Sequence, residues 1–458
     1  MEKLLVPALA LVVPTMALAA PGTVDTGDTA LVLVSAGLVL LMTPGLAFFY
    51  GGLVRAKNVV HTMIMSLACM ALVGVLWGLV SYSLAFAPGP GVLDRFVGGL
   101  GFVGLRGVGG EVAKDLAPTV PHAAFMLFQA MFAVITPALI SGALVERVRM
   151  KAFVLFVALW SVVVYTPVAH WVWAPGGWLR QLGALDFAGG TVVHINAAAA
   201  ALVFAIVLGR RRGLRVPTVL PHNVPFAILG AGLLWFGWLG FNGGSALAAN
   251  GLAATAFANT FFAPAAASLA WGLAELFFFH GKMSGVGLAS GAVAGLVAVT
   301  PAAGFITPLS SIGLGAAAGI ASLLAVRVRP RLGLDDALDV FAVHGVAATL
   351  GALLTGVLAT RAVNPDGADG SLRLLGVQLV GVLATYVWSG GLSWGILRLV
   401  ALVTPLRSEE QDEWSGLDIA ESGERAYINA DDSAFGHRPE PAHAHAHAPA
   451  LHEVAAKS

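Results

Sequence analysis

Long apolar segments dominate this sequence and restrict what the chain can fold into. About eleven of them reach the length, about twenty residues, that a helix needs to cross the hydrocarbon core of a bilayer. Helices satisfy their own backbone hydrogen bonds in lipid, so we predict an all-α integral membrane protein with eleven transmembrane helices. The predicted spans are 29–51, 59–80, 121–146, 152–172, 188–209, 224–244, 253–279, 284–302, 306–327, 337–360 and 372–403.

The overall composition is typical of a protein in a lipid bilayer and argues against a nucleic-acid-binding protein or an enzyme. Hydrophobic residues make up 58% of the chain and charged residues 11%. The formal net charge is +0, which offers no argument for a nucleic-acid partner. The sequence contains no zinc-protease helix motif, no P-loop and no nucleophile elbow. We therefore expect no enzymatic activity, no cofactor and no metal, and we favour transport.

The two ends of the chain differ from the apolar middle. Residues 1–19 have an early lysine, a short apolar body and a small-residue end, which predicts a cleaved signal peptide; an uncleaved first helix is the alternative. We expect residues 28–404 to form the membrane domain and 405–458 a cytoplasmic tail. The His-rich end of that tail is typical of disorder, with weak metal binding as the alternative.

Basic residues alternate from one connector to the next and predict the orientation. The connectors 55–58, 146–151, 210–215, 280–282 and 327–333 are richer in Lys and Arg than the connectors between them. The positive-inside rule places these basic connectors in the cytoplasm. With an odd number of spans, the mature N-terminus then lies outside and the C-terminus inside. We expect a multi-pass protein of the cell inner membrane.

Two histidines lie inside predicted spans, where an ionisable side chain is costly and points to function. His194 and His344 are 344 − 194 = 150 residues apart, in the fifth and tenth spans, each in a Val-His pair with Asp186 or Asp339 upstream. Five spans per half predict an inverted-topology repeat with a pathway between the halves. The two rings can pair across one narrow pore; the alternative is that a backbone carbonyl binds each ring separately.

Aromatic residues form a second candidate group, because an aromatic face attracts a small cation and a nearby hydroxyl can accept its hydrogen bonds. The alternative for each ring is ordinary core packing, or an interfacial belt for the tryptophans near residue 173. Asp186 precedes the fifth span, where it caps a helix or contacts a substrate. The aromatic and hydroxyl candidates are Phe125, Phe128, Phe132, Trp171, Trp173, Trp178, Trp235, Trp238, Phe241 and Ser245.

Several long motifs resemble one family of membrane proteins. They include MTPGLAFFYGGLVRAKNV (42–59), FQAMFAVITPALISGALVERVR (128–149), ALDFAGGTVVHINAAAAALV (184–203) and DVFAVHGVAATLGALLTG (339–356). These motifs are similar to those of the ammonium transporter, methylammonium permease and Rhesus protein family, in its ammonium transporter branch. The resemblance runs from about residue 28 to residue 428.

The resemblance implies a homotrimer with a pore through each protomer, built from an inverted five-helix repeat plus a final helix. It implies that ammonium is recruited at an outer site, deprotonated, and passed as ammonia through a hydrophobic pore, with possible separate proton transfer. The implied roles are recruitment by Trp173, Phe132 and Ser245, a gate of Phe132 and Phe241, a pore pair of His194 and His344, and support from Asp186, Gln129, Thr300, Phe128 and Trp238.

Some features leave alternatives open. The loop between Trp173 and Asp186 is one residue longer than in the family pattern, so Trp178 is an alternative to Trp173. The motif GLDIAESGERAY (416–427) resembles the family's tail motif and implies a PII-type signal protein as a partner, although Ser422 departs from it. The alternative functions are an ammonium sensor that signals through its tail, and a Rhesus-like gas channel.

Overall fold

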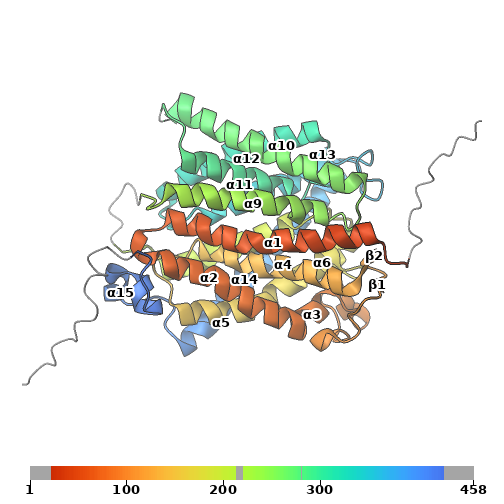
Figure 1. The fold of residues 1–458 in the computed structure, drawn as a ribbon, viewed down its shortest axis with the longest axis horizontal. Coiled ribbons are helices and arrows are strands. Elements are labelled where there is room, and N and C mark those ends of the chain that lie inside the picture. Colours follow the sequence, from red (N-terminus) through yellow and green to blue (C-terminus); the bar gives the residue numbers. More distant parts are fainter. Residues whose placement is uncertain (1–21, 213–219, 280, 428–458) are drawn as a thin grey trace, which may run out of the picture.

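The computed structural model describes residues 22–212, 220–279 and 281–427. Helices lie side by side along one axis and form a bundle (Figure 1). The signal peptide predicted for 1–19 and the His-rich end lie outside the described residues. The longer helices are α1 (Thr26–Leu53), α2 (Val59–Leu76), α4 (His122–Ser141), α5 (Met150–Trp160), α8 (Asn196–Leu208), α9 (Val224–Gly244), α10 (Gly251–Ala274), α11 (Gly285–Val299), α12 (Pro308–Val328), α13 (Ala347–Leu358) and α14 (Leu372–Val403).

Shorter elements complete the described part of the chain. Strands β1 (Val112–Ala113) and β2 (Ala117–Pro121) form an antiparallel pair in the connector before α4. Five-residue π-helical segments continue α2, α5 and α10; they are η2 (Trp77–Ser81), η5 (Ser161–Tyr165) and η7 (Glu275–Phe279). The short helices are α3 (Tyr82–Phe86), α6 (Thr166–Trp173), α7 (Trp178–Leu182) and α15 (Glu410–Ser415).

The predicted spans largely correspond to helices. Among the described residues, ten helical segments are long and apolar enough to cross a membrane. The exception is the predicted span 284–302, where α11 has only 15 residues. The chain turns after Val299, and Pro301 has no N–H with which to continue the helical ladder. The third span also ends earlier than predicted, at Ser141 rather than 146.

The helices begin where the sequence supplies capping groups. The carboxylate of Asp25 accepts a hydrogen bond from the N–H of Asp28 at the start of α1, at 2.9 Å. Ser284 caps α11 in the same way through the N–H of Gly287, at 2.8 Å. Such side-chain acceptors satisfy N–H groups that the helix itself leaves free.

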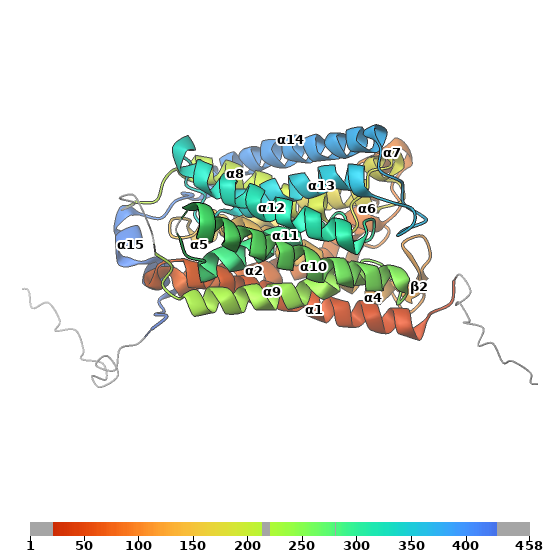
Figure 2. The same ribbon diagram turned by 90° about the horizontal axis from the view of Figure 1, so that it is seen from above.

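Small residues allow the helices to pack closely. A Cβ added at Gly230 of α9 would lie 2.2 Å from the backbone nitrogen of Phe49 in α1, so only glycine fits this crossing. Seen from above, α14 runs along one side of the bundle and α1 and α9 run along the opposite side (Figure 2). Most buried apolar side chains belong to one continuous core.

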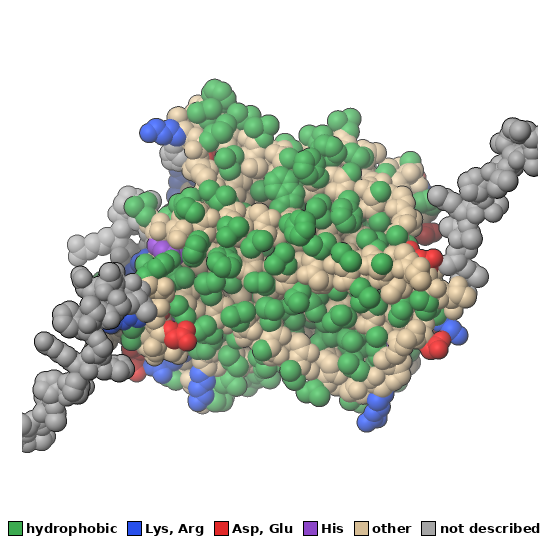
Figure 3. All heavy atoms as spheres, in the orientation of Figure 1, with side chains coloured by type: hydrophobic (Ala, Val, Ile, Leu, Met, Phe, Trp, Pro, Cys, Tyr) green, Lys and Arg blue, Asp and Glu red, His purple; other side chains and the backbone are tan. Residues whose placement is uncertain are grey.

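The surface has the distribution expected of a multi-pass membrane protein. Hydrophobic side chains cover the middle of the molecule, and charged side chains gather toward its two ends (Figure 3). Large apolar side chains on the helices face outward; Val387 of α14 is 74% exposed and Phe236 of α9 is 54% exposed. Such exposed apolar side chains along the helices suit lipid rather than water.

Buried ion pairs join the basic connectors at one end of the bundle, which we call the tail end because α15 lies there (Figure 1). The carboxylate of Glu146 lies 2.8 Å from Nη2 of Arg55 and 3.2 Å from Nη1 of Arg211. Nη2 of Arg211 also lies 2.9 Å from Asp335. Burial alone would raise the pKa of Asp335, but hydrogen bonds and charge from Arg211 outweigh it and hold that pKa below its usual value.

The tail binds the connector before α2 and the first turn of α2 at this end. Nζ of Lys57 donates to the carbonyl oxygens of Glu413 and Trp414, at 3.0 and 2.5 Å, where α15 ends. In return, the carboxylate of Asp418 accepts a hydrogen bond from the N–H of His61 in the first turn of α2, at 2.8 Å. The described part of the tail is therefore attached to the membrane domain.

Replacing Gly416 with alanine is expected to release the tail. Gly416 has φ +109°, and an added Cβ would lie 2.6 Å from the carbonyl oxygen of Lys57. We expect the tail to open roughly 10- to 100-fold more often, measured as the rate of limited trypsin cleavage within it. Gly423→Ala is the matched control, since Gly423 has φ +69° with no atom near the added Cβ. Equal cleavage rates for the two variants would contradict the prediction.

Candidate functional site

Two helices bring the histidines together in the middle of the bundle. His194 lies in the π-helical segment η6 (Gly190–Ile195), which continues as α8, and His344 lies in η9 (Phe341–Val346), which continues as α13. Both side chains are buried, at 1% and 2% exposure. Their Nδ1 atoms lie 3.3 Å apart, and the rings stack with an interplanar angle of 21°.

This geometry requires different tautomers in the two rings. A hydrogen bond between two Nδ1 atoms needs one protonated and one unprotonated nitrogen, so the neutral rings carry their protons at different positions. Nε2 of His194 is buried and has no hydrogen-bond partner within the described chain. Of the two alternatives raised by the sequence, the structure has the rings paired with each other. The contact uses only the Nδ1 atoms, so the Nε2 atom of each ring is left for a small solute.

An aspartate caps each of the two helices that carry a histidine. The Asp186 carboxylate accepts hydrogen bonds at 2.7–3.2 Å from four successive N–H groups, those of residues 189–192. Burial raises the pKa of Asp186 even though these four hydrogen bonds act in the opposite direction. These four contacts are those of a helix cap.

The second helix is capped by Asp336, which corrects the pairing expected from the sequence. Asp336 accepts a hydrogen bond from the N–H of Phe341 at 2.6 Å, and 336 − 186 = 150, the spacing of the histidines. Asp339, which the sequence suggested as the partner of Asp186, corresponds instead to Gly189. Both have positive φ, 59° and 113°, because the chain turns there into the helix.

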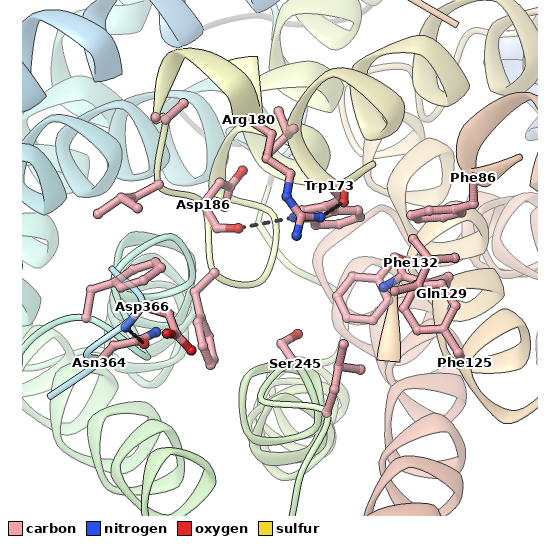
Figure 4. A pocket seen from close by; sticks show the side chains of 18 residues that line it. Phe86, Phe125, Gln129, Phe132, Trp173, Arg180, Asp186, Ser245, Asn364 and Asp366 are labelled. Atoms are coloured by element: carbon pink, nitrogen blue, oxygen red, sulfur yellow. Dashed lines mark hydrogen bonds between the residues drawn. The ribbon is translucent and has the colours of Figure 1, made fainter. Parts of the chain in front are cut away.

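A cavity of about 450 Å³ opens at the end of the bundle that carries β1 and β2, which we call the strand end. Trp173, Phe132 and Ser245 line this strand-end vestibule together, although they come from three different helical segments (Figure 4). The ring of Trp173 meets that of Phe132 edge to face, with centroids 5.7 Å apart. Trp173 is held by a hydrogen bond from its indole N–H to the carbonyl oxygen of Asp186, at 3.1 Å.

Two oxygen atoms in the vestibule wall can accept hydrogen bonds from a solute. The Ser245 hydroxyl donates to the carbonyl oxygen of Phe241 at 2.8 Å, which leaves its lone pairs free. Oε1 of Gln129 is buried and has no partner within the described residues. Gln129 therefore belongs to the vestibule wall (Figure 4).

The structure distinguishes Trp173 from Trp178, the alternative that the sequence left open. Trp178 lies outside the vestibule and packs against Trp171, with ring centroids 5.7 Å apart, in a groove beside α14. The longer loop between Trp173 and Asp186 forms the short helix α7, which takes Trp178 away from the cavity. Of the two tryptophans, only Trp173 lines the vestibule.

Closely packed aromatic rings lie between the vestibule and the histidines. Phe132 and Phe241 are buried, with ring centroids 4.3 Å apart. Phe128 packs edge to face against Phe132, at 4.9 Å. Beyond them, the Trp238 ring stacks on His194 at 5.2 Å and donates its N–H to the Thr300 hydroxyl at 2.8 Å. Phe128 and Thr300 thus support the wall from behind.

The space beside the histidines is narrow and apolar. A cavity of about 10 Å³ lies against both rings, Trp238 and Phe241, and its other walls are aliphatic side chains. This volume is roughly that needed by one water-sized molecule. A small neutral solute therefore fits this part of the path, whereas a hydrated ion does not.

A second mouth lies at the tail end and was missed by sequence reasoning. A cavity of about 530 Å³ is lined by Arg211, Glu275, Asp339 and Val343, among others. Asp339 pairs with Nε of Arg329 at 2.9 Å. These residues come from connectors and helix ends that are far apart in the sequence, so no local signal joins them. Within the described residues, no group of three or more His, Cys, Asp or Glu is arranged to hold a metal ion.

Together, the bundle, a cavity at each end and the narrow apolar cavity beside the histidines define a helical membrane transport protein. A family model described as "Ammonium Transporter Family" matches residues 30–427. The chain is 49% identical over 406 residues to an ammonium transporter of Bacillus subtilis, covering 88% of this chain and 98% of that relative. The chain belongs to the ammonium transporter family.

Solved structures agree with this membership. The crystal structure of Candida albicans Mep2 matches with a TM-score of 0.80 and 36% identity, covering 88% of this chain and 91% of that one. A structure described as "Sensor Amt Protein" matches with a TM-score of 0.79 at a lower identity of 28%, covering 86% and 98%. The fold is shared by all of these proteins.

Proposed function

We propose that this protein moves ammonium or ammonia across the cytoplasmic membrane. The observation that carries the proposal is the order of the parts along one path. An aromatic and hydroxyl-lined vestibule leads to the Phe132–Phe241 pair, and directly beyond these rings lie His194 and His344. Membership of the ammonium transporter family supports the same solute.

The vestibule suits ammonium for two physical reasons. The faces and edges of Trp173 and Phe132 surround a space in which a small cation gains cation–π attraction. Ser245 and Gln129 offer oxygen acceptors for the N–H groups of ammonium. Potassium is similar to ammonium in size and charge but cannot donate hydrogen bonds, so the oxygen acceptors favour ammonium.

The narrow path favours the neutral molecule. Moving a full charge into a dry apolar space costs on the order of several kcal/mol even after relaxation. We propose that ammonium gives its proton to solvent water in the open vestibule and that ammonia passes the two phenylalanine rings. Ammonia then hydrogen-bonds to the histidine pair, which can also carry a proton separately from one mouth to the other.

We extend the proposal to topology and assembly. The short helix α11 is the eighth of eleven spans and adds to the ten longer helical segments. The two five-helix halves form an inverted repeat, supported by the equal 150-residue spacing of the capping aspartates and the histidines. The protein lies in the cell inner membrane, with the strand end facing outside and the basic tail end facing the cytoplasm.

The proposal also covers the domains and the assembly. Residues 1–19 are a cleaved signal peptide, residues 28–404 form the membrane domain, and residues 405–458 form the cytoplasmic regulatory tail. The protein assembles as a homotrimer with one pore per protomer, and a PII-type signal protein binds at the tail end.

The alternative functions fit the site less well. A sensor needs a part that transmits the signal, whereas the described tail residues 405–427 hold two short helical segments, α15 and Asp418–Ser422, and pack against the start of α2 and the connector before it. A Rhesus-like gas channel has no need of a developed cation site, whereas Trp173, Phe132 and Ser245 converge on one cavity.

Proteoliposomes on a solid-supported membrane test the proposal. A pulse of ammonium chloride is expected to evoke a current in the wild-type protein that an equal pulse of potassium chloride does not. A dye inside the vesicles reports ammonia entry as a rise in pH. If correctly folded protein gives neither signal, the transport proposal is wrong.

Replacing Ser245 with alanine is expected to weaken ammonium recruitment. Loss of one acceptor costs about 1 kcal/mol, so the half-saturating ammonium concentration should rise roughly 3- to 10-fold in the same current measurement. Thr255→Val is the matched control: the Thr255 hydroxyl also donates to a carbonyl four residues earlier, at 2.9 Å, and it does not line the vestibule. A similar rise in both variants would argue against a specific role for Ser245.

A further inference from the structure

The strand-end vestibule has a positive charge in its own wall. Arg180 lies in the short helix α7 and lines the cavity proposed to recruit a cation. Its guanidinium Nη1 donates a hydrogen bond to the carbonyl oxygen of Trp173. The Arg180 side chain, although exposed, therefore extends toward Trp173 (Figure 4). A fixed positive charge beside a cation site requires an explanation.

The other charged residues of the vestibule do not neutralise this charge directly. The two carboxylates in the wall are those of Asp186 and Asp366. Asp186 is directed to the four backbone N–H groups that it caps. Asp366 is exposed, and no hydrogen bond or ion pair between it and Arg180 is found among the contacts of the described residues. The charge of Arg180 thus acts on whatever enters the cavity.

A second cavity lies next to the vestibule and shares Arg180 with it. This cavity has a volume of about 490 Å³, and the residues common to both are Phe86, Leu116 and Arg180. Arg180 therefore stands in the wall between two spaces at the strand end. Low-dielectric walls strengthen the potential of a fixed charge in such hollows.

Electrostatics determine what this charge does. The repulsion between Arg180 and a cation grows in proportion to the charge of the cation, so it is twice as large for a divalent ion at the same distance. We propose that Arg180 is a specificity-determining residue that keeps divalent cations out of the vestibule and lowers its affinity for ammonium. Only a cation that gains binding free energy from the aromatic rings and the oxygen acceptors overcomes the repulsion by Arg180. The inference rests on the proposed function.

Currents recorded against ammonium concentration, with and without millimolar magnesium at constant ionic strength, test this role. In Arg180→Gln, we expect the half-saturating ammonium concentration to fall roughly 3- to 10-fold and magnesium to inhibit the current. Arg180→Lys keeps the charge and should behave like the wild-type protein. Arg106→Gln is the matched control, because Arg106 lies in a strand-end connector and lines neither cavity.

The wild-type protein offers a second measurement that needs no variant. Because salt screens the repulsion, its half-saturating ammonium concentration should fall as ionic strength rises, and this dependence should be weaker in Arg180→Gln. An unchanged or higher half-saturating concentration in Arg180→Gln, or the same behaviour in the Gln and Lys variants, overturns the inference and leaves Arg180 as a support for Trp173. Absence of both current and ammonia entry in the wild-type protein overturns the proposed function and this inference with it.

Discussion

Replacing both His194 and His344 with alanine is expected to abolish the ammonium-evoked current. The pair offers hydrogen-bonding nitrogens in a space whose other walls are apolar. Without it, a proton has no group to occupy between the two mouths, and a bare charge there costs on the order of several kcal/mol. We therefore expect at least a roughly 100-fold loss of current per folded protein on a solid-supported membrane.

The matched control is a buried histidine outside the path. His61 in α2 is fully buried and lies at the tail end, so His61→Ala tests whether loss of any buried imidazole impairs the protein. The internal dye separates two results in the double variant. If ammonia still enters but no current flows, the histidine pair is needed for proton transfer and not for the passage of ammonia. An undiminished current would contradict a route through the histidines.

Replacing Asp186 with alanine is expected to destabilise the fold as well as stop transport. Its carboxylate accepts four backbone hydrogen bonds at the start of η6, and the alanine variant leaves these N–H groups without acceptors inside the protein. Each unsatisfied buried group costs about 1–3 kcal/mol, so for four groups we expect a loss of at least about 4 kcal/mol. Thermal unfolding in detergent measures this loss, and Asp186→Asn, which keeps one acceptor oxygen, should be intermediate.

This prediction also separates the two roles that the sequence left open for Asp186. A capping residue affects stability and transport together. If Asp186→Ala unfolds at the wild-type temperature but carries no current, then Asp186 acts on the cation and not as a cap. Asp336→Ala is the matched comparison, because Asp336 caps the second histidine helix and lies outside the vestibule.

The candidate site could be predicted in part because its chemistry stands out locally. A histidine in an apolar span can be recognised from the sequence alone. The resemblance to a known family assigned roles to Trp173, Phe132 and Ser245. The structure brings these three residues to one cavity. Arg180 and Asp366 could not be found in this way, because a charged residue in a polar connector looks like any other exposed residue until the fold places it in a cavity wall.

The amino-acid sequence by itself determined the class of fold, because hydropathy and length act locally and need no knowledge of neighbours. It also determined which connectors share one end, since basic residues mark them; Arg55, Glu146 and Arg211 indeed form ion pairs there. Only the tertiary structure decided which aspartate caps the second histidine helix and which tryptophan lines the vestibule. It also decided how Gly416 fits the tail against Lys57. These contacts depend on distances between residues far apart in the chain, which the packing of whole helices sets.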